Sequence, residues 1–282
     1  NTSISELNIN YELLFINDGS KDESLVNIMH LAKLDSRVTY INLSRNFGHQ
    51  IAVSAGLDYC KGAAAVIIDA DLQDPPELIP SLYRKFKEGY NVVYAKRVHR
   101  QGEGFFKKVS AKLFYIFLHK ISSIDIPVDV GDFRIIDRKI INYLNKMPEK
   151  NKFLRGQIAW LGFRQTSIEF HRSERKAGRS GYSLSKMIQL AMDAITGFSD
   201  KPLSFVTSLG FFISLFSFFI IVYALYAHFI LQRTITGWTS LIISSMFIGG
   251  VQLLSLGIIG EYIGKIYMET KRRPRYILEK EI

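Results

Sequence analysis

The chain has 282 residues, 48% of them hydrophobic, enough for one medium domain with a sizeable core and a further element. Its net charge of +10 is compatible with nucleic acid, anionic lipid or an anionic substrate as a partner. The single cysteine, Cys60, excludes an internal disulfide and a metal site built from cysteines, which is typical of a reducing compartment.

Short β-rich runs alternate with helical patterns in the first hundred residues. Strands are predicted over 11–17, 38–43, 64–68 and 91–95, and helices over 22–34, 49–59 and 78–87. This alternation is typical of βαβ units, so we expect an α/β domain with a mostly parallel sheet. Such sheets bind ligands beyond the carboxyl ends of their strands, where polar clusters should therefore be sought.

Two polar clusters directly follow predicted strands. Residues 17–20 (NDGS) combine a turn glycine with a serine suited to capping a helix. In residues 69–76 (DADLQDPP), alternation places Asp69 and Asp71 on the same side of an extended chain, where they repel unless a cation lies between them. Asp71 and Gln73 offer hard oxygen ligands for Mg²⁺ or Mn²⁺; the alternative is that Asp71 and Asp74 only cap a turn.

Two long apolar runs occupy the last third of the chain. Apart from His228, no Asp, Glu, Lys, Arg or His occurs in 203–232, and none occurs in 234–260. Each run exceeds the ~20 residues that cross a ~30 Å hydrocarbon core, and both lie too far from the N-terminus to be signal peptides. We therefore expect a two-helix transmembrane hairpin after the soluble domain.

The basic residues indicate the orientation of this hairpin. They crowd its two outer flanks, whereas the connecting loop holds only Arg233. By the positive-inside rule, the soluble domain and the C-terminal tail are cytoplasmic in a multi-pass protein of the cell membrane. The lipid bilayer is then the expected partner, and nucleic acid is not.

Six motifs occur in a fixed order along the chain. They are FINDGSKDES (15–24), LSRNFGHQIAVSAGLD (43–58), DADLQDPPEL (69–78), DVGDFRIIDR (129–138), ERKAGRSGYS (174–183) and GEYIGKIYMETKRRPRY (260–276). Together they resemble family 2 glycosyltransferases of the GT-A fold. Within that family they are similar to polyprenyl-phosphate glycosyltransferases of the dolichol-phosphate mannose synthase and bactoprenol glucosyltransferase type.

This resemblance implies roles for individual residues. Asp132 and Arg134 would be catalytic, with Asp132 beside the anomeric carbon, and Asp71 and Gln73 would hold Mg²⁺ or Mn²⁺ on the donor diphosphate. The nucleotide-sugar donor would be bound by five residues: Asp18, Asp69, Arg175, Ser180 and Tyr182. The phosphate of the acceptor would be bound by Arg97 and Lys108.

The resemblance also implies the organisation of the chain. We expect a GT-A domain over 1–182 that lacks an N-terminal strand, a juxtamembrane amphipathic helix over 183–201, transmembrane helices over 202–232 and 234–263, and a basic tail over 264–282. The loop before the second transmembrane helix would be short and non-cytoplasmic. Gly249 and Gly250 favour close helix packing, either within one chain or in a homo-oligomer.

The implied activity is a metal-dependent, inverting transfer of one hexose from a UDP- or GDP-sugar to a polyprenyl phosphate, which supplies a lipid-linked sugar for the cell envelope. Two alternatives stay open. One is an inactive, membrane-anchored binding or scaffold protein, against which the presence of Asp71, Gln73, Asp132 and Arg175 argues. The other is a processive polysaccharide synthase, whose Q-x-x-R-W signature is not matched by RGQIAW (155–160).

Overall fold

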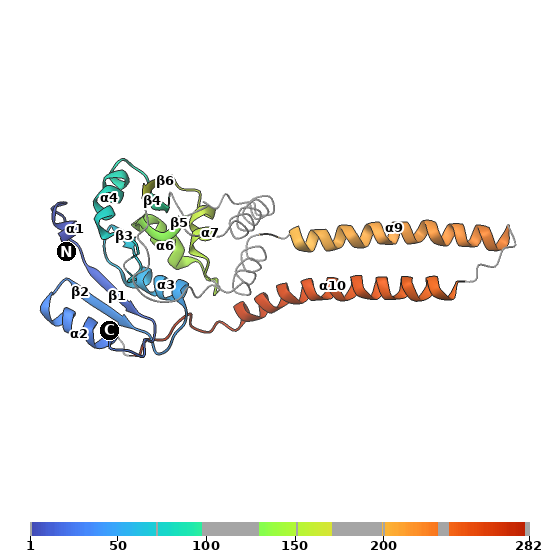
Figure 1. The fold of residues 1–282 in the computed structure, drawn as a ribbon, viewed down its shortest axis with the longest axis horizontal. Coiled ribbons are helices and arrows are strands. Elements are labelled where there is room, and N and C mark those ends of the chain that lie inside the picture. The colour runs from blue at the N-terminus through green and yellow to red at the C-terminus, as the bar shows by residue number, and fades with distance from the viewer. Residues whose placement is uncertain are drawn as a thin grey trace. The chain divides into compact units, whose positions relative to one another are not determined.

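The computed structural model divides the chain into two compact units (Figure 1). The first comprises Asn1–Ala194 together with Arg273–Ile282, and the second comprises Ile195–Arg272. The structure describes residues 2–71, 73–97, 130–150, 152–170, 199, 201–230 and 237–279.

The first unit is an α/β domain, as predicted. Its described helices are α1 (Thr2–Ser5), α2 (Ser24–Leu34), α3 (His49–Tyr59), the 3₁₀ helix η1 (Pro76–Leu78), α4 (Ile79–Lys87), α6 (Arg138–Lys146) and α7 (Leu154–Trp160). Its described strands are β1 (Leu13–Asn17), β2 (Val38–Asn42), β3 (Ala64–Ile67), β4 (Val92–Arg97), β5 (Val130–Asp137) and β6 (Gln165–Phe170). The four strands predicted from the sequence correspond to β1–β4.

The described strands form two sheets, the first parallel and the second of mixed direction. β1 pairs in parallel with β2, and the second sheet has the order β3-β5-β4-β6. β4 and β6 are parallel, but β5 runs antiparallel to both β3 and β4. The expectation of a mostly parallel sheet thus fails at β5, because repeating βαβ units predict only parallel neighbours and the sequence pattern did not predict β5 as a strand.

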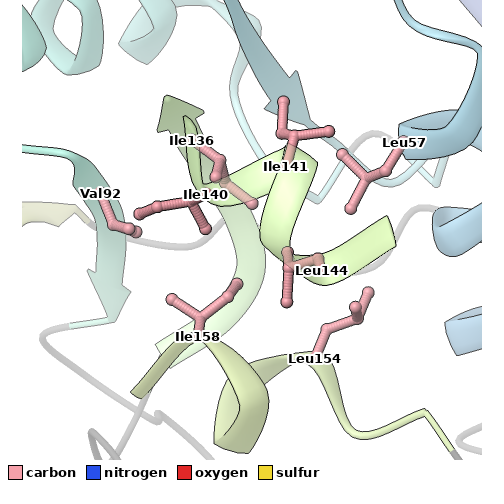
Figure 2. Packing of buried hydrophobic residues seen from close by; sticks show 8 residues of the cluster. All are labelled: Leu57, Val92, Ile136, Ile140, Ile141, Leu144, Leu154 and Ile158. Carbon is pink, nitrogen blue, oxygen red and sulfur yellow. The ribbon is translucent and has the colours of Figure 1, made fainter. Parts of the chain in front are cut away.

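Two apolar clusters lie on the two faces of the second sheet. β5 is buried on both faces, so its side chains alternate between the clusters. The cluster shared with α3, α6 and α7 contains Leu57, Val92, Ile136, Ile140, Ile141, Leu144, Leu154 and Ile158 (Figure 2). The cluster beside α4 contains Leu82, Val93, Ala95, Phe133, Ile135 and Phe170. By the same alternation, Asp132 and Arg134 share the face of Ile136.

The second unit contains the two long apolar helices that the sequence predicts. α9 spans Lys201–Phe229 and α10 spans Trp238–Thr270, and their apolar stretches have mean hydropathies of 2.4 and 2.0. The hydroxyl of Tyr262 on α10 donates to the carbonyl of Ser199, just before α9, at 2.7 Å. By length and composition, both helices are able to cross a membrane.

Candidate active site

Asp132 is the centre of a hydrogen-bonded cluster near the start of β5. Its Oδ2 lies 2.9 Å from Nε2 of His49 and accepts from Nε2 of Gln50 at 3.2 Å. Arg155 on α7 donates to both carboxylate oxygens, from Nε at 3.0 Å and from Nη2 at 3.3 Å. Arg134 approaches Oδ1 to 3.4 Å with its Nη2. One carboxylate is therefore surrounded by two arginines and a histidine.

These neighbours keep Asp132 ionised. Burial alone would raise the pKa of Asp132, but the hydrogen bond with His49 and the charges of Arg155 and Arg134 hold it well below its usual range. Burial also lowers the pKa of Arg134 to about 10, against the effect of Asp132, so Arg134 remains a cation at neutral pH. An anion this strongly stabilised is a poor proton acceptor and is suited to stabilising positive charge.

The start of α3 supplies two members of the cluster. His49 and Gln50 are its first residues, and Gly48 before them has φ +99°, a conformation that L side chains rarely adopt. A substitution at Gly48 would therefore strain the turn that directs His49 and Gln50 toward Asp132. The N-terminal end of a helix also favours a nearby anion.

The antiparallel direction of β5 brings Asp132 to the acidic end of β3. The register pairs Ala64 with Asp137 and Ile67 with Arg134, so the chain beyond β3 runs toward the start of β5, where Asp132 lies. His49 lies between the two carboxylates, since its Nε2 is also 3.8 Å from Oδ1 of Asp69. Two predicted site residues thus meet at one end of the sheet.

Asp71 and Gln73 form a turn beyond Asp69. Oδ1 of Asp71 accepts the backbone N–H of Gln73 at 3.1 Å, and Gln73 is buried whereas Asp71 is exposed. Among the residues that the structure describes, no group of three or more His, Cys, Asp or Glu side chains could hold a metal ion. A carboxylate and an amide nonetheless suit a Mg²⁺ or Mn²⁺ ion that takes its other ligands from phosphate and water.

Asp18 fastens the turn after β1 to the loop that precedes α3. Its carboxylate accepts the backbone N–H groups of Phe47 at 2.7 Å and Gly48 at 2.9 Å. The turn and the loop also approach closely at Gly19, where a Cβ atom would lie 2.5 Å from the backbone of Arg45. The turn that contains Asp18 is therefore held directly against the start of α3.

Several predicted site residues lie outside the described part of the chain. These are Lys108, Arg175, Ser180 and Tyr182, and the predicted helix over 183–201 falls there except for Ser199 and Lys201. Arg97 ends β4, and its side chain is not described.

Sequence reasoning missed three residues of the Asp132 cluster: His49, Gln50 and Arg155. The signal for His49 and Gln50 was their position within the 43–58 motif, at the start of a predicted helix. Arg155 lies in the RGQIAW stretch (155–160), which carries no local signal of a site.

An α/β domain with aspartates beyond β3 and an ionised carboxylate beside them is the arrangement expected of a glycosyltransferase of the GT-A fold. Residues 2–144 match the family model described as Glycosyl transferase family 2. The chain belongs to this family, which confirms the resemblance drawn from the six motifs and the prediction that the protein is an enzyme.

Relatives cover most of the chain. An uncharacterized glycosyltransferase of Bacillus subtilis (strain 168), YkcC, is 52% identical over 271 residues, 96% of this chain and 84% of the relative. The bactoprenol glucosyl transferase of Shigella phage SfV is 42% identical over 272 residues, 96% of this chain and 88% of the relative. Among solved structures, glucosyl-3-phosphoglycerate synthase from Mycobacterium tuberculosis with Mn²⁺, UDP and phosphoglyceric acid is 18% identical, with a TM-score of 0.43 and 69% of each chain covered.

The charge state of His49 gives a test of the cluster. The hydrogen bond to Asp132 raises the pKa of His49 despite its partial burial. The stability that this bond contributes should be fully present below the unfolded pKa of about 6.5 and lost as pH rises through the raised folded value. We expect His49→Gln to lower the melting temperature more at pH 5.5 than at pH 9, by thermal unfolding. An equal decrease at both pH values would contradict this assignment.

Proposed function

We propose that the protein transfers one hexose from a UDP- or GDP-sugar to a polyprenyl phosphate, with inversion at the anomeric carbon, to supply a lipid-linked sugar for the cell envelope. The observation that carries the proposal is Asp132, a buried carboxylate kept ionised by three neighbouring side chains. Relatives named bactoprenol glucosyl transferase, at 40–42% identity, support the class of acceptor.

The chemistry of the transfer fits an ionised Asp132. Departure of a nucleoside diphosphate leaves positive charge on the anomeric carbon, which a fixed carboxylate stabilises. The acceptor phosphate is already an anion, so it needs no strong general base. In this scheme, the Asp132 carboxylate is held in position by His49, Gln50 and Arg155. The buried Arg134 compensates its charge.

The donor would occupy the end of the sheet beside Asp69. We assign the nucleotide sugar to Asp18, Asp69, Arg175, Ser180 and Tyr182, and the acceptor phosphate to Arg97 and Lys108. Asp71 and Gln73 would hold the divalent cation, which when bound neutralises charge on the departing diphosphate. The turn closed by the Asp71–Gln73 hydrogen bond supports this pairing, because it keeps both side chains beyond the same strand.

The apolar helices would bring the enzyme to its acceptor. We propose that α9 and α10 span the cell membrane as a hairpin, with the basic flanks and the GT-A domain on the cytoplasmic side. A polyprenyl chain dissolves in the bilayer while its phosphate lies at the surface. A membrane-anchored active site would therefore meet that phosphate at a fixed depth.

An assay with the purified full chain in detergent tests this function. The reaction contains Mg²⁺ or Mn²⁺, undecaprenyl phosphate and one of several radiolabelled UDP- or GDP-hexoses. We expect one donor to give a labelled glycolipid, and the label to stay in the aqueous phase when the lipid is omitted. Failure of every donor to form glycolipid would refute the proposal. Glu88→Gln, an exposed change beside Lys85, serves as a control that should retain full activity.

Removal of the metal should abolish this activity. Excess EDTA is expected to stop glycolipid formation, and added Mg²⁺ or Mn²⁺ should restore it. Asp71→Asn should raise the metal concentration required for half-maximal rate by about tenfold or more, since it removes a charged oxygen ligand. Full activity in EDTA, or an unchanged metal requirement in Asp71→Asn, would contradict the assignment.

A further inference from the structure

A segment that follows α10 in the sequence pairs with the end of β2. The segment, residues 275–279, is here named the C-terminal clamp. Ser44 donates its backbone N–H to the carbonyl of Ile277 at 2.9 Å, and Leu43 forms an antiparallel bridge with Leu278. The clamp therefore adds a third, antiparallel segment beside the parallel pair β1–β2.

Side chains anchor the clamp on α3. Asp58 accepts hydrogen bonds from Nη2 of Arg275 at 3.2 Å and from the hydroxyl of Tyr276 at 2.9 Å. Burial, together with the bond to Asp58, raises the pKa of Tyr276, so its hydroxyl stays a donor at physiological pH. Tyr276 and Leu278 also pack against the buried cluster of Ile41, Leu43 and Ala55. The clamp thus has both polar and apolar attachments.

A chain of amide hydrogen bonds leads from the clamp to the turn after β1. The carboxylate of Glu279 accepts from Nδ2 of Asn42, and Oδ1 of Asn42 accepts from Nδ2 of Asn17 at 2.7 Å. Oδ1 of Asn17 in turn accepts the backbone N–H of Ser20 at 3.3 Å. This turn contains Asp18. Each asparagine is fixed in one orientation, because its amide nitrogen and oxygen both have partners.

The clamp therefore supports both backbone segments that lie beside Asp18, the turn after β1 and the loop before α3. Through Asn42 and Asn17 it supports the turn after β1, and through Ser44 it supports the start of the loop whose N–H groups bind the Asp18 carboxylate. We propose that the C-terminal clamp positions the nucleotide-binding part of the active site. This inference rests on the proposed function, because it takes Asp18 as a ligand of the donor nucleotide.

The clamp should affect donor binding and not the chemical step. The clamp reaches the segments beside Asp18 through Asn42 and Ser44, whereas the Asp132 carboxylate is held by His49, Gln50 and Arg155. Loss of the clamp contacts should weaken nucleotide binding and raise the donor KM, while kcat changes little. If the clamp were merely structural, loss of its contacts would lower the fraction of folded enzyme and hence the apparent kcat. The KM of the molecules that remain folded would not change.

The test compares substitutions on alternate residues of the clamp. Leu278 packs into the cluster, whereas the side chain of Ile277 is 55% exposed, so Ile277→Ala is a matched control for Leu278→Ala. Glu279→Ala removes the first acceptor of the amide chain, and Glu279→Gln retains one. Binding of UDP and GDP is measured by titration calorimetry on the full chain in detergent with Mg²⁺, alongside donor kinetics.

We expect Glu279→Ala and Leu278→Ala each to weaken nucleotide binding and raise the donor KM by about five- to tenfold, a loss typical of one broken contact. Ile277→Ala and Glu279→Gln should stay within about twofold of the unaltered protein. If Leu278→Ala fails to fold, the comparison of Glu279→Ala with Glu279→Gln decides.

Two outcomes would overturn the inference, and they are separable. Unchanged nucleotide affinity in folded Glu279→Ala, while the unaltered protein binds nucleotide and forms glycolipid, would remove the role of the clamp alone. Absence of nucleotide binding in the unaltered protein would refute the proposed function and the inference with it.

Discussion

Asp132→Asn is expected to reduce kcat by about a hundred- to a thousandfold, the range found when one preorganised electrostatic group is removed. Asparagine retains the shape of the side chain and can still bond to Arg155, but it removes the negative charge that would face the anomeric carbon in the proposed reaction. Initial rates at saturating donor and acceptor provide the measurement. The donor KM should change little, because the lost interaction belongs to the transition state.

The control for this variant addresses stability. Arg134 is buried and has Asp132 as a charge partner. Asp132→Asn therefore removes the negative charge that compensates a buried cation. Breaking such a pair from one side commonly costs about 3–5 kcal/mol. The double variant Asp132→Asn, Arg134→Leu should therefore recover part of the melting temperature without recovering activity. Retention of more than half the activity by folded Asp132→Asn would show that the carboxylate charge is not required.

The elements predicted from the sequence are those with a regular apolar pattern. β1–β4 and the helices α2, α3 and α4 follow periods that local sequence displays. β5 was not predicted, because Asp132 and Arg134 interrupt its apolar pattern with two charges. Those charges are tolerated in a buried strand because Asp132 and Arg134 compensate each other. His49 and Arg155, from elsewhere in the chain, add hydrogen bonds to the Asp132 carboxylate.

Which residues meet in the site depends on the direction of each strand in the sheet, and local sequence does not encode that direction. Asp69 directly follows a predicted strand, but Asp132 stands near the start of β5, and in an all-parallel sheet the end of one strand and the start of another lie at opposite ends of the strands. The antiparallel course of β5 brings them together. The C-terminal clamp is a similar case, since Glu279 and Asn42 are 237 residues apart in the sequence.

Arg155→Ala is expected to change the pH dependence of the reaction as well as its rate. Arg155 binds both oxygens of Asp132 and helps to hold the pKa of that carboxyl well below its usual range. Without it, the pKa of Asp132 should rise, so the rate should begin to fall at a higher pH on the acid side. We also expect kcat at pH 7.5 to decrease about tenfold or more, because the carboxylate loses a two-point support.

The conservative variant separates charge from geometry at this position. Arg155→Lys keeps a cation but lacks the planar pair of donors, so it should preserve most of the pH profile while kcat stays reduced. Arg164→Ala, which removes an exposed arginine stacked on Tyr90, is the matched control and should leave both unchanged. A pH profile of Arg155→Ala that coincides with that of the unaltered enzyme would mean that Arg155 does not tune Asp132. His49 and Arg134 would then be sufficient to keep the carboxylate ionised.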